Sequence, residues 1–251
     1  MLSTIRTAVA LGALGIAAAA PAALAQDPAP LSQAERSAVE QVVRDYLLAH
    51  PEVIMEALTV LQTRQEQSER QRQAEQLSSL DEEIFRSPGS PVMGNPEGNV
   101  TLVEFFDYQC GYCKSMLEPL NALRERDPDL RMVMKELPIL SPASTTAAKA
   151  ALAAELQGKY TEFHLAMMGY RGRLDDDVVF ATAEQVGLDV ERLKADMESE
   201  AVAAEIAANM RLAQQLGIRG TPAFIVGDDI VPGAVDVRAL EALIAEQRGE
   251  G

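Results

Sequence analysis

Tryptophan is absent from the 251 residues, and cysteine and histidine occur only twice each. Two cysteines cannot build a disulfide-rich scaffold or a four-thiolate zinc site, so they can act only as one pair. Basic residues are also scarce, since 22 Lys and Arg stand against 38 Asp and Glu and give a net charge of −16. Because an acidic surface repels phosphates, we expect neither a nucleic-acid partner nor binding to an anionic membrane. The hydrophobic content of 47% and the charged content of 24% are typical of a folded globular protein.

The first residues have the pattern of an export leader. Arg6 precedes an apolar run over 8–20, and the sequence Ala-Leu-Ala at 23–25 has the small residues of a signal-peptidase site. The apolar run is shorter than the roughly 20 residues of a membrane span. We therefore predict a signal peptide over 1–25, which places the two cysteines in an oxidising compartment. There a thiol pair is either a stable bridge or a redox catalyst.

Residues 26–90 are predicted to form a helical extension. Between Ser32 and Leu61, apolar residues recur at helical spacing in two runs that Pro51 separates. Over 62–76 the apolar stripe stops and polar and charged residues take its place, so this stretch is expected to be solvated on all sides. The extension is interpreted either as helices that lie on the catalytic domain or as an oligomerisation stalk followed by a polar linker.

Residues 91–251 have the pattern of an α/β domain. Apolar and β-branched runs predict strands over 100–106, 131–137, 223–226 and 230–231, with helices over 115–126 and 236–246. An alanine-rich helical block over about 141–216 is predicted to be inserted between the second and third of these strands.

Cys110 and Cys113 lie at the junction of a predicted strand and a predicted helix. At a helix N-terminus, unpaired N–H groups and the helix dipole favour an anion, so Cys110 is the expected nucleophilic thiolate. Cys113 lies one turn inside, where it can attack a mixed disulfide on Cys110 and release the product. A zinc site is the alternative, but only His50 and His164 could complete it. We expect no metal.

Two further positions fit the same chemistry. Glu104 lies six residues before Cys110 in the strand and is a candidate buried carboxylate that exchanges a proton with the thiol pair, or else a solvated charge at a strand edge. Thr221 and Pro222 stand directly before a strand, where a cis bond would expose backbone groups to a substrate chain, although an ordinary turn proline has the same sequence pattern.

Two runs carry a resemblance to a known family. The run VEFFDYQCGYC, which ends at Cys113, and the run GIRGTPAF over 217–224 resemble the DsbA family of thioredoxin-fold disulfide oxidoreductases. The resemblance covers about residues 92–248. It implies a thioredoxin fold with an inserted helical domain, a redox-active disulfide Cys110–Cys113 that needs no other cofactor, and a cis-proline at Pro222. The extension is similar in layout to that of the ScsC (suppressor of copper sensitivity) type, whose characterised members include trimers formed through it.

Gly111 and Tyr112 separate the cysteines at the place where strongly oxidising DsbA proteins carry Pro-His. Without an imidazole beside the thiolate, the bridge is expected to be less oxidising. Together with Thr221, the pair resembles that of the DsbC isomerase. We therefore expect a periplasmic disulfide isomerase or reductase that acts on unfolded or misdisulfided exported proteins, including copper-oxidised ones. We also expect a homo-oligomer, with a trimer favoured over a dimer, kept reduced by a membrane thiol donor of the DsbD or ScsB type.

Two other functions remain open. A DsbA-like dithiol oxidase would have a strongly oxidising potential. A Cu(I)-binding protein would use the two thiolates as soft ligands. The chain has 10 methionines. Met132 and Met134 share a predicted strand, and Met167 and Met168 lie in a predicted helix, so they are interpreted as core-filling residues. No Met-x-x-Met array is present.

Overall fold

The computed structural model describes residues 31–249, so the predicted signal peptide over 1–25 lies outside the described residues. The chain divides into two compact units, Met1–Gln62 and Thr63–Gly251. Within the described residues, no helix has the length and apolar character needed to cross a membrane.

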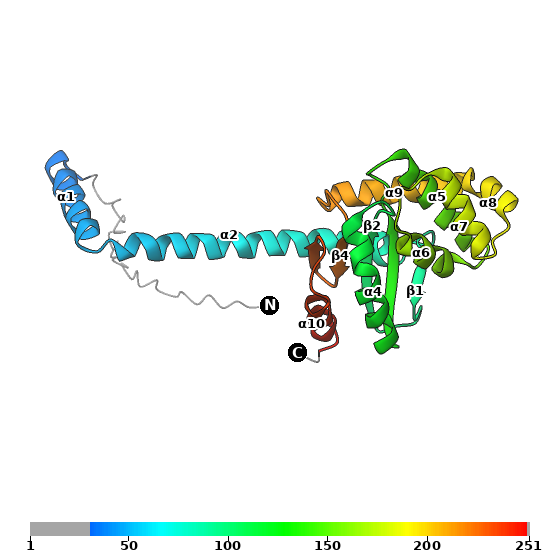
Figure 1. Ribbon diagram of the computed structural model, residues 1–251. Coiled ribbons are helices and arrows are strands. Elements are labelled where there is room, and N and C mark those ends of the chain that lie inside the picture. Colours follow the sequence, from blue (N-terminus) through cyan, green and yellow to red (C-terminus); the bar gives the residue numbers. More distant parts are fainter. Residues whose placement is uncertain (1–30, 250–251) are drawn as a thin grey trace, which may run out of the picture. The chain divides into compact units, whose positions relative to one another are not determined.

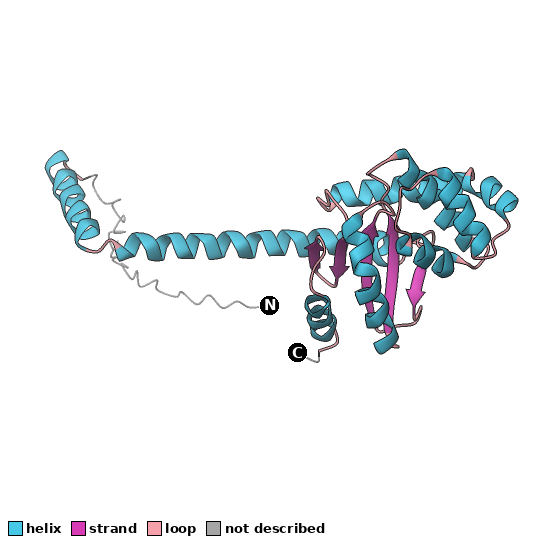
Figure 2. Ribbon diagram, viewed as in Figure 1, coloured by secondary structure: helices cyan, strands magenta, loops and turns pink. Residues whose placement is uncertain are grey.

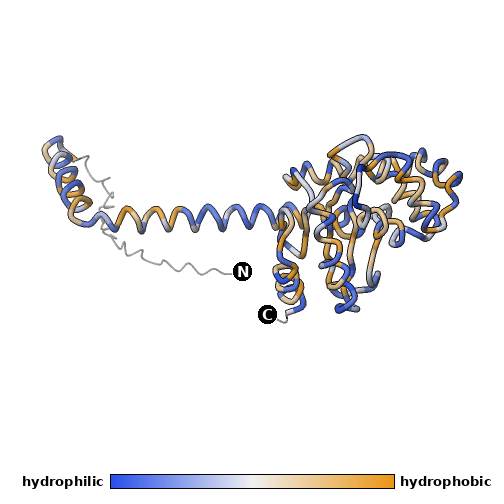
Figure 3. The backbone as a smooth tube through the Cα atoms, viewed as in Figure 1, coloured by the Kyte–Doolittle hydropathy of each residue, from blue (hydrophilic) through white to orange (hydrophobic). Residues whose placement is uncertain are grey.

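The first unit consists of helix α1 (Gln33–Ala49) and the beginning of helix α2 (Glu52–Ser79). Ser32 and Glu35 form a capping box, in which Ser32 Oγ accepts from the Glu35 N–H at 3.4 Å and Glu35 Oε2 accepts from the Ser32 N–H at 2.8 Å. Most large apolar residues of α1 and of α2 up to Leu61 are exposed, and Figure 3 shows them followed by a hydrophilic stretch of α2. The helical extension is therefore confirmed.

A sheet of five strands organises the second unit, in the order β1-β3-β2-β4-β5. Its strands are β1 (Val92–Gly94), β2 (Val100–Phe106), β3 (Leu130–Glu136), β4 (Ala223–Val226) and β5 (Asp229–Pro232). The central strands β2 and β3 run parallel, and every other neighbouring pair is antiparallel. Both faces of β2 and β3 are covered, since six of the seven residues in each strand are buried, and β2 is accordingly a nearly continuous apolar run. Figure 2 shows the strands side by side with helices around them.

The remaining helices are α3 (Asp81–Phe85), α4 (Gly111–Arg126), α5 (Pro142–Glu155), α6 (Tyr160–Gly169), α7 (Asp176–Gln185), α8 (Val190–Met197), α9 (Glu200–Gln215) and α10 (Val237–Gln247). Helices α5 to α9 lie between β3 and β4 in the sequence, which confirms the thioredoxin fold with a helical insertion (Figure 1). Helix α5 packs against α6, α7, α8 and α9. Its buried face consists mostly of alanines, which allow four helices to approach it closely.

Side chains of β2 alternate between two cores. Leu102 and Phe106 belong to the core that α4 and the inserted helices cover, whereas Val103 and Phe105 face a second core on the other side of the sheet. The second core also includes Leu77 from the end of α2 and Ile84 from α3. The division after Gln62 therefore differs from the predicted boundary at residue 90, because these two side chains are buried against the sheet.

The polar stretch over 62–76 is exposed along most of its length, as expected from its sequence. Its last turns, however, are attached to the second unit. Gln73 Nε2 donates to the carbonyl oxygen of Asp228 at 2.9 Å, and Gln76 Nε2 donates to that of Gln215. These contacts fix the last turns of the stretch, and a linker over the residues before them stays a prediction.

Candidate active site

Strand β2 and helix α4 place the two cysteines. Cys110 is the N-cap of α4, with φ −70° and ψ 115°, and its Sγ accepts from the N–H of Cys113 at 3.4 Å. Sulfur here takes the place that a Ser or Asp oxygen takes at other helix N-termini, where it satisfies one free N–H group of the first turn. Both thiols are buried, with Cys110 6% and Cys113 2% exposed.

Thr221 and Pro222 lie beside the first cysteine. The bond between them is cis, and the Cys110 Sγ donates to the Thr221 carbonyl oxygen at 3.2 Å. Strand β4 begins directly after this bond and pairs antiparallel with β2, which brings the loop to the end of the sheet where α4 begins. The structure thus brings the cysteine pair and the Thr221–Pro222 motif together, although they are more than a hundred residues apart in the sequence.

Glu104 is buried in the middle of the sheet, where it pairs with Met134 of β3 and Phe224 of β4. The alternative of a solvated charge at a strand edge is therefore wrong. Burial raises the pKa of Glu104 to about 8. The carboxyl and the Cys113 thiol line one cavity of about 10 Å³, which is the volume that one water molecule requires. Burial, followed by the charge of Glu104, raises the pKa of Cys113 well above its ordinary value.

Asp107 organises the turn between β2 and Cys110, and the sequence analysis missed it. Its Oδ1 accepts from the Gln109 N–H and from Ser144 Oγ, both at 2.7 Å. Its Oδ2 accepts from the N–H groups of Ile139 at 2.9 Å and Leu140 at 3.0 Å. An Asp side chain at a tight turn often accepts a hydrogen bond from the backbone N–H two residues later. The position of Asp107 between a predicted strand and Cys110 could have indicated its bond to the Gln109 N–H.

A buried polar cluster lies beside this turn and was also missed. Tyr108 and Tyr160 each donate to Glu136 Oε1 at 3.1 Å, and the Tyr108 hydroxyl lies 3.2 Å from His164 Nδ1. Burial raises the pKa of Glu136 and lowers the pKa of His164 to about 3, so the imidazole is neutral. The cluster anchors Tyr108 and with it the chain that leads to Cys110.

The two residues between the cysteines face the solvent. Gly111 is exposed, and the Tyr112 side chain is 71% exposed. In the next turn, Lys114 Nζ donates to the Tyr170 carbonyl oxygen at 2.6 Å. Within residues 31–249, no group of three or more His, Cys, Asp or Glu side chains could hold a metal ion.

Comparison with known proteins decides the family. The model described as the DSBA-like thioredoxin domain matches residues 101–245. The chain belongs to the DSBA-like thioredoxin family. A second model, described as the copper resistance protein ScsC N-terminal domain, matches residues 35–68. The resemblance of the extension to the ScsC type is therefore also confirmed.

Solved structures of this family agree with the assignment. A thioredoxin-like oxidoreductase from Silicibacter pomeroyi DSS-3 is 47% identical, with a TM-score of 0.66 over 68% of this chain and 98% of that chain. ScsC of Proteus mirabilis in a transitional conformation is 30% identical, with a TM-score of 0.65 over 88% of this chain and 100% of that one. A periplasmic thioredoxin-like protein from Salmonella enterica serovar Typhimurium is 31% identical, with a TM-score of 0.61 over 68% and 96%.

The curated relatives are longer proteins. A Na⁺/H⁺ antiporter NhaA from Herminiimonas arsenicoxydans is 32% identical over 160 residues, and this chain spans 26% of its length. The matching part amounts to 63% of this chain, so the similarity concerns only about a quarter of the antiporter.

Proposed function

We propose that this DSBA-like protein is a periplasmic thiol–disulfide oxidoreductase that acts as a disulfide isomerase or reductase on misfolded or copper-oxidised exported proteins. One observation carries the proposal. The Sγ of Cys110 caps α4 and lies 3.2 Å from the carbonyl oxygen of Thr221, while Cys113 and the carboxyl of Glu104 line a cavity behind it.

The reaction begins at Cys110. Its thiolate attacks one sulfur of a substrate disulfide, a new S–S bond joins Cys110 to the substrate, and the other substrate sulfur leaves as a thiolate. In isomerisation, a substrate thiolate then attacks the substrate sulfur of this mixed disulfide. The native disulfide forms, Cys110 is expelled as a thiolate, and no net oxidation takes place.

Reduction uses the second cysteine. The Cys113 sulfur attacks Cys110 Sγ, the substrate leaves as a thiol, and a Cys110–Cys113 disulfide remains. Cys113 must first lose its proton, which burial opposes. Glu104 is the group in the same cavity that can accept this proton, since its pKa of about 8 matches a proton acceptor near neutral pH. A membrane thiol donor of the DsbD or ScsB type would return the bridge to two thiols.

The isomerase role is supported by the extension and by Tyr112. An isomerase holds a misfolded chain while its bonds exchange, which an oligomer with several sites does well. Helix α1 exposes the apolar side chains of Val39, Val42 and Tyr46, and a partner helix would bury them. We propose that identical copies supply this partner, with a trimer favoured over a dimer. Tyr112 supplies no cation beside Cys110, which favours a less oxidising couple.

Two substitutions in α1 test the proposal. Val42→Asp places a charge in the apolar stripe, and Ser37→Asp places the same charge on the polar face of the helix. We expect wild type and Ser37→Asp to be oligomers that reactivate a scrambled disulfide protein. Val42→Asp should be a monomer that reduces glutathione disulfide and no longer reactivates the scrambled protein. Equal reactivation by both variants, or a monomeric wild type, would contradict the role of the extension. A purely oxidising activity would favour the DsbA-like oxidase.

Cu(I) binding is the second candidate function. The cavity beside Cys113 is lined by the thioethers of Met93, Met132, Met134 and Met168, and thioethers and thiolates are ligands that Cu(I) prefers. Competition against a Cu(I) chelator tests this candidate. An affinity no tighter than that of an ordinary dithiol leaves only the redox role.

A further inference from the structure

Lys114 and Arg171 form a pair of cationic side chains beside the two cysteines. Lys114 follows Cys113 in the first turn of α4, and its N–H donates to the Cys110 carbonyl oxygen at 3.0 Å. Residues four apart are neighbours on one face of a helix. Arg171 lies just after α6, and its Nη2 donates to the Lys114 carbonyl oxygen at 3.3 Å. An anionic group bound to the two cations would therefore lie within about one helical turn of a sulfur bonded to Cys110.

One backbone oxygen holds the two side chains close to each other. Lys114 Nζ donates to the Tyr170 carbonyl oxygen at 2.6 Å, and Arg171 Nη1 donates to the same oxygen at 3.5 Å. The two nitrogens are therefore within about 6 Å of each other, a distance at which like charges repel. Arg171 Nη1 also donates to the Met168 carbonyl oxygen at 2.6 Å. The carbonyls at the end of α6, which lack helical partners, thus explain why two cations gather here.

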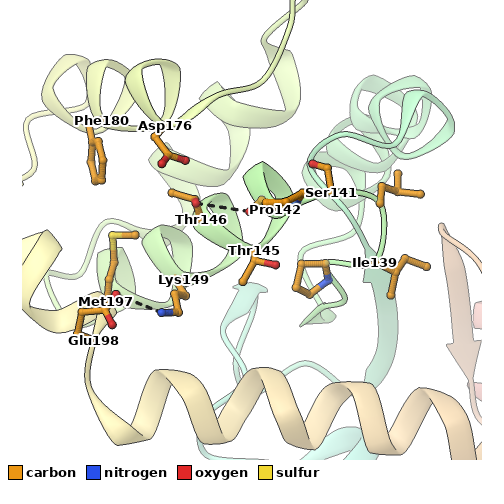
Figure 4. A pocket seen from close by; sticks show the side chains of 12 residues that line it. Ile139, Ser141, Pro142, Thr145, Thr146, Lys149, Asp176, Phe180, Met197 and Glu198 are labelled. Atoms are coloured by element: carbon orange, nitrogen blue, oxygen red, sulfur yellow. Dashed lines mark hydrogen bonds and ion pairs between the residues drawn. The ribbon is translucent and has the colours of Figure 1, made fainter.

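Neither cation has a carboxylate as its partner. Within residues 31–249, no Asp or Glu side chain forms an ion pair with Lys114 or Arg171. Lys149 shows the opposite case, since its Nζ forms an ion pair with Glu198 at 3.1 Å (Figure 4). Asp107 acts on Lys114 through its charge, but both of its oxygens already accept hydrogen bonds. In a chain with 38 acidic and 22 basic side chains, two adjacent cations without an acidic partner leave positive charge available for a ligand.

Both side chains also keep hydrogen-bond donors for a ligand. An ammonium group has three N–H bonds and a guanidinium group has five. Lys114 Nζ uses one of them on the Tyr170 carbonyl oxygen, and Arg171 donates only to backbone carbonyl oxygens. Burial, followed by the charge of Arg171, lowers the pKa of Lys114. A bound anion would accept from the remaining donors and offset the repulsion between the two cations.

We propose that Lys114 and Arg171 form a subsite for a carboxylate that stands next to the reacting cysteine of a disulfide substrate. A carboxylate suits the pair because its two oxygens can accept from both cations at once. The side chains of Asp and Glu supply such a group in a polypeptide. The inference rests on the proposed function and names the substrate class, a disulfide whose cysteine has acidic neighbours.

A single-turnover experiment on the reduced, full-length protein tests the subsite. The substrates are three short peptides that differ only in the residues on both sides of one cysteine, which are Glu, Gln or Lys. Each peptide is bonded through its cysteine to mercaptoethanol. The reaction converts the enzyme dithiol to its disulfide and releases the peptide thiol and mercaptoethanol. Each rate is divided by the rate of the same substrate with dithiothreitol, which removes differences in intrinsic reactivity.

Wild type should react about fivefold faster with the Glu peptide than with the Gln peptide, because this factor corresponds to the attraction of opposite unit charges about 4 Å apart in water. The Lys peptide should be the slowest. The rates are measured at about 0.1 M salt, where charges more than about 10 Å apart are largely screened. Under these conditions the net charge of the whole protein contributes little to the preference.

Arg171→Glu places a carboxylate beside Lys114 and should remove the preference for the Glu peptide. Arg171→Lys retains the charge and should retain the preference. Arg211→Glu is the matched control, because it changes the net charge by the same amount as Arg171→Glu. Arg211 is exposed on α9, whose Leu212 belongs to the core on the opposite face of the sheet from α4. The control should keep the fivefold preference.

Equal normalised rates of wild type with the Glu and Gln peptides would overturn the subsite. Equal losses of the preference in Arg171→Glu and Arg211→Glu would overturn it as well, because the selection would then come from the charge of the whole protein. The isomerase role fails in a different way. If wild type prefers the Glu peptide but reactivates no scrambled disulfide protein, the subsite stands and the isomerase role falls. If none of the peptide disulfides is reduced, the oxidoreductase function and the subsite both fall.

Discussion

Glu104 of β2 and Cys113 of α4 line the same buried cavity, so a carboxyl and a resolving thiol share a space of about 10 Å³. The carboxyl has a pKa of about 8, and burial raises the pKa of the thiol as well. Burial therefore keeps Cys113 and most of Glu104 protonated at neutral pH. The minor fraction of Glu104 that is ionised is the form that can accept the proton of Cys113, and this fraction grows as the pH approaches 8.

Glu104→Gln should slow the release of a peptide from its mixed disulfide with Cys110 by about 100-fold, because an amide cannot accept a proton. In wild type, the release rate should rise with pH up to about pH 8, where Glu104 becomes ionised, and the variant should lose this rise. Stopped-flow measurement of release across pH checks both effects. Glu118→Gln, which removes an exposed carboxyl from α4, is the control and should match wild type. An unchanged pH profile in Glu104→Gln would exclude the carboxyl as the proton acceptor.

The same group makes stability depend on pH. The pKa of Glu104 is raised from 4.5 to about 8 in the folded state. Below pH 4.5 the carboxyl is protonated in both the folded and the unfolded state, so its contribution to the free energy of unfolding is fully present there. Between these values the unfolded chain is ionised and the native protein is not, and the free energy of unfolding should fall by about 1.4 kcal/mol per pH unit. Urea denaturation at several pH values should give a flatter curve for Glu104→Gln. If Glu104→Gln and Glu118→Gln gave parallel curves, the raised pKa would be wrong.

The sequence could predict the parts that depend on short-range patterns. The apolar run of β2 and the position of Cys110 at the start of α4 are local features, and each lies where it was expected. Strand β1 was missed because its three residues show no alternation, and it exists through its antiparallel pairing with β3. Its formation depends on a neighbour that is remote in the sequence.

The boundary of the second unit likewise could not be predicted from local sequence patterns. Leu77 and Ile84 have helical spacing, which indicates that one face is buried but not what covers it. The sheet covers them, and the sequence analysis had assigned them to the extension. The polar cluster of Tyr108, Glu136 and His164 was missed for the same reason, since it joins three separate elements.

Asp107→Asn should destabilise the protein by about 2 to 4 kcal/mol, because the buried carboxylate accepts four hydrogen bonds and an amide nitrogen cannot accept those that it would face. Urea denaturation at fixed pH measures the change. The exposed Asp129 provides a control, and Asp129→Asn should change the free energy of unfolding by no more than about 0.5 kcal/mol. Equal stability of the two variants would show that the Asp107 bonds do not hold the loop.

Tyr112→His should make the redox couple more oxidising by about 30 mV, which corresponds to about 1.4 kcal/mol of preferential stabilisation of the reduced form. An imidazolium beside Cys110 stabilises its thiolate, and since the Tyr112 side chain is 71% exposed, the change should leave the free energy of unfolding within about 0.5 kcal/mol of wild type. Equilibration against glutathione measures the potential. The increase should be present below the ordinary imidazole pKa of about 6.5 and should disappear above it, because only the protonated ring carries the charge. Tyr112→Phe retains the ring without the charge and should match wild type. If Tyr112→His and Tyr112→Phe had the same potential at low pH, the residue between the cysteines would not control the couple through charge.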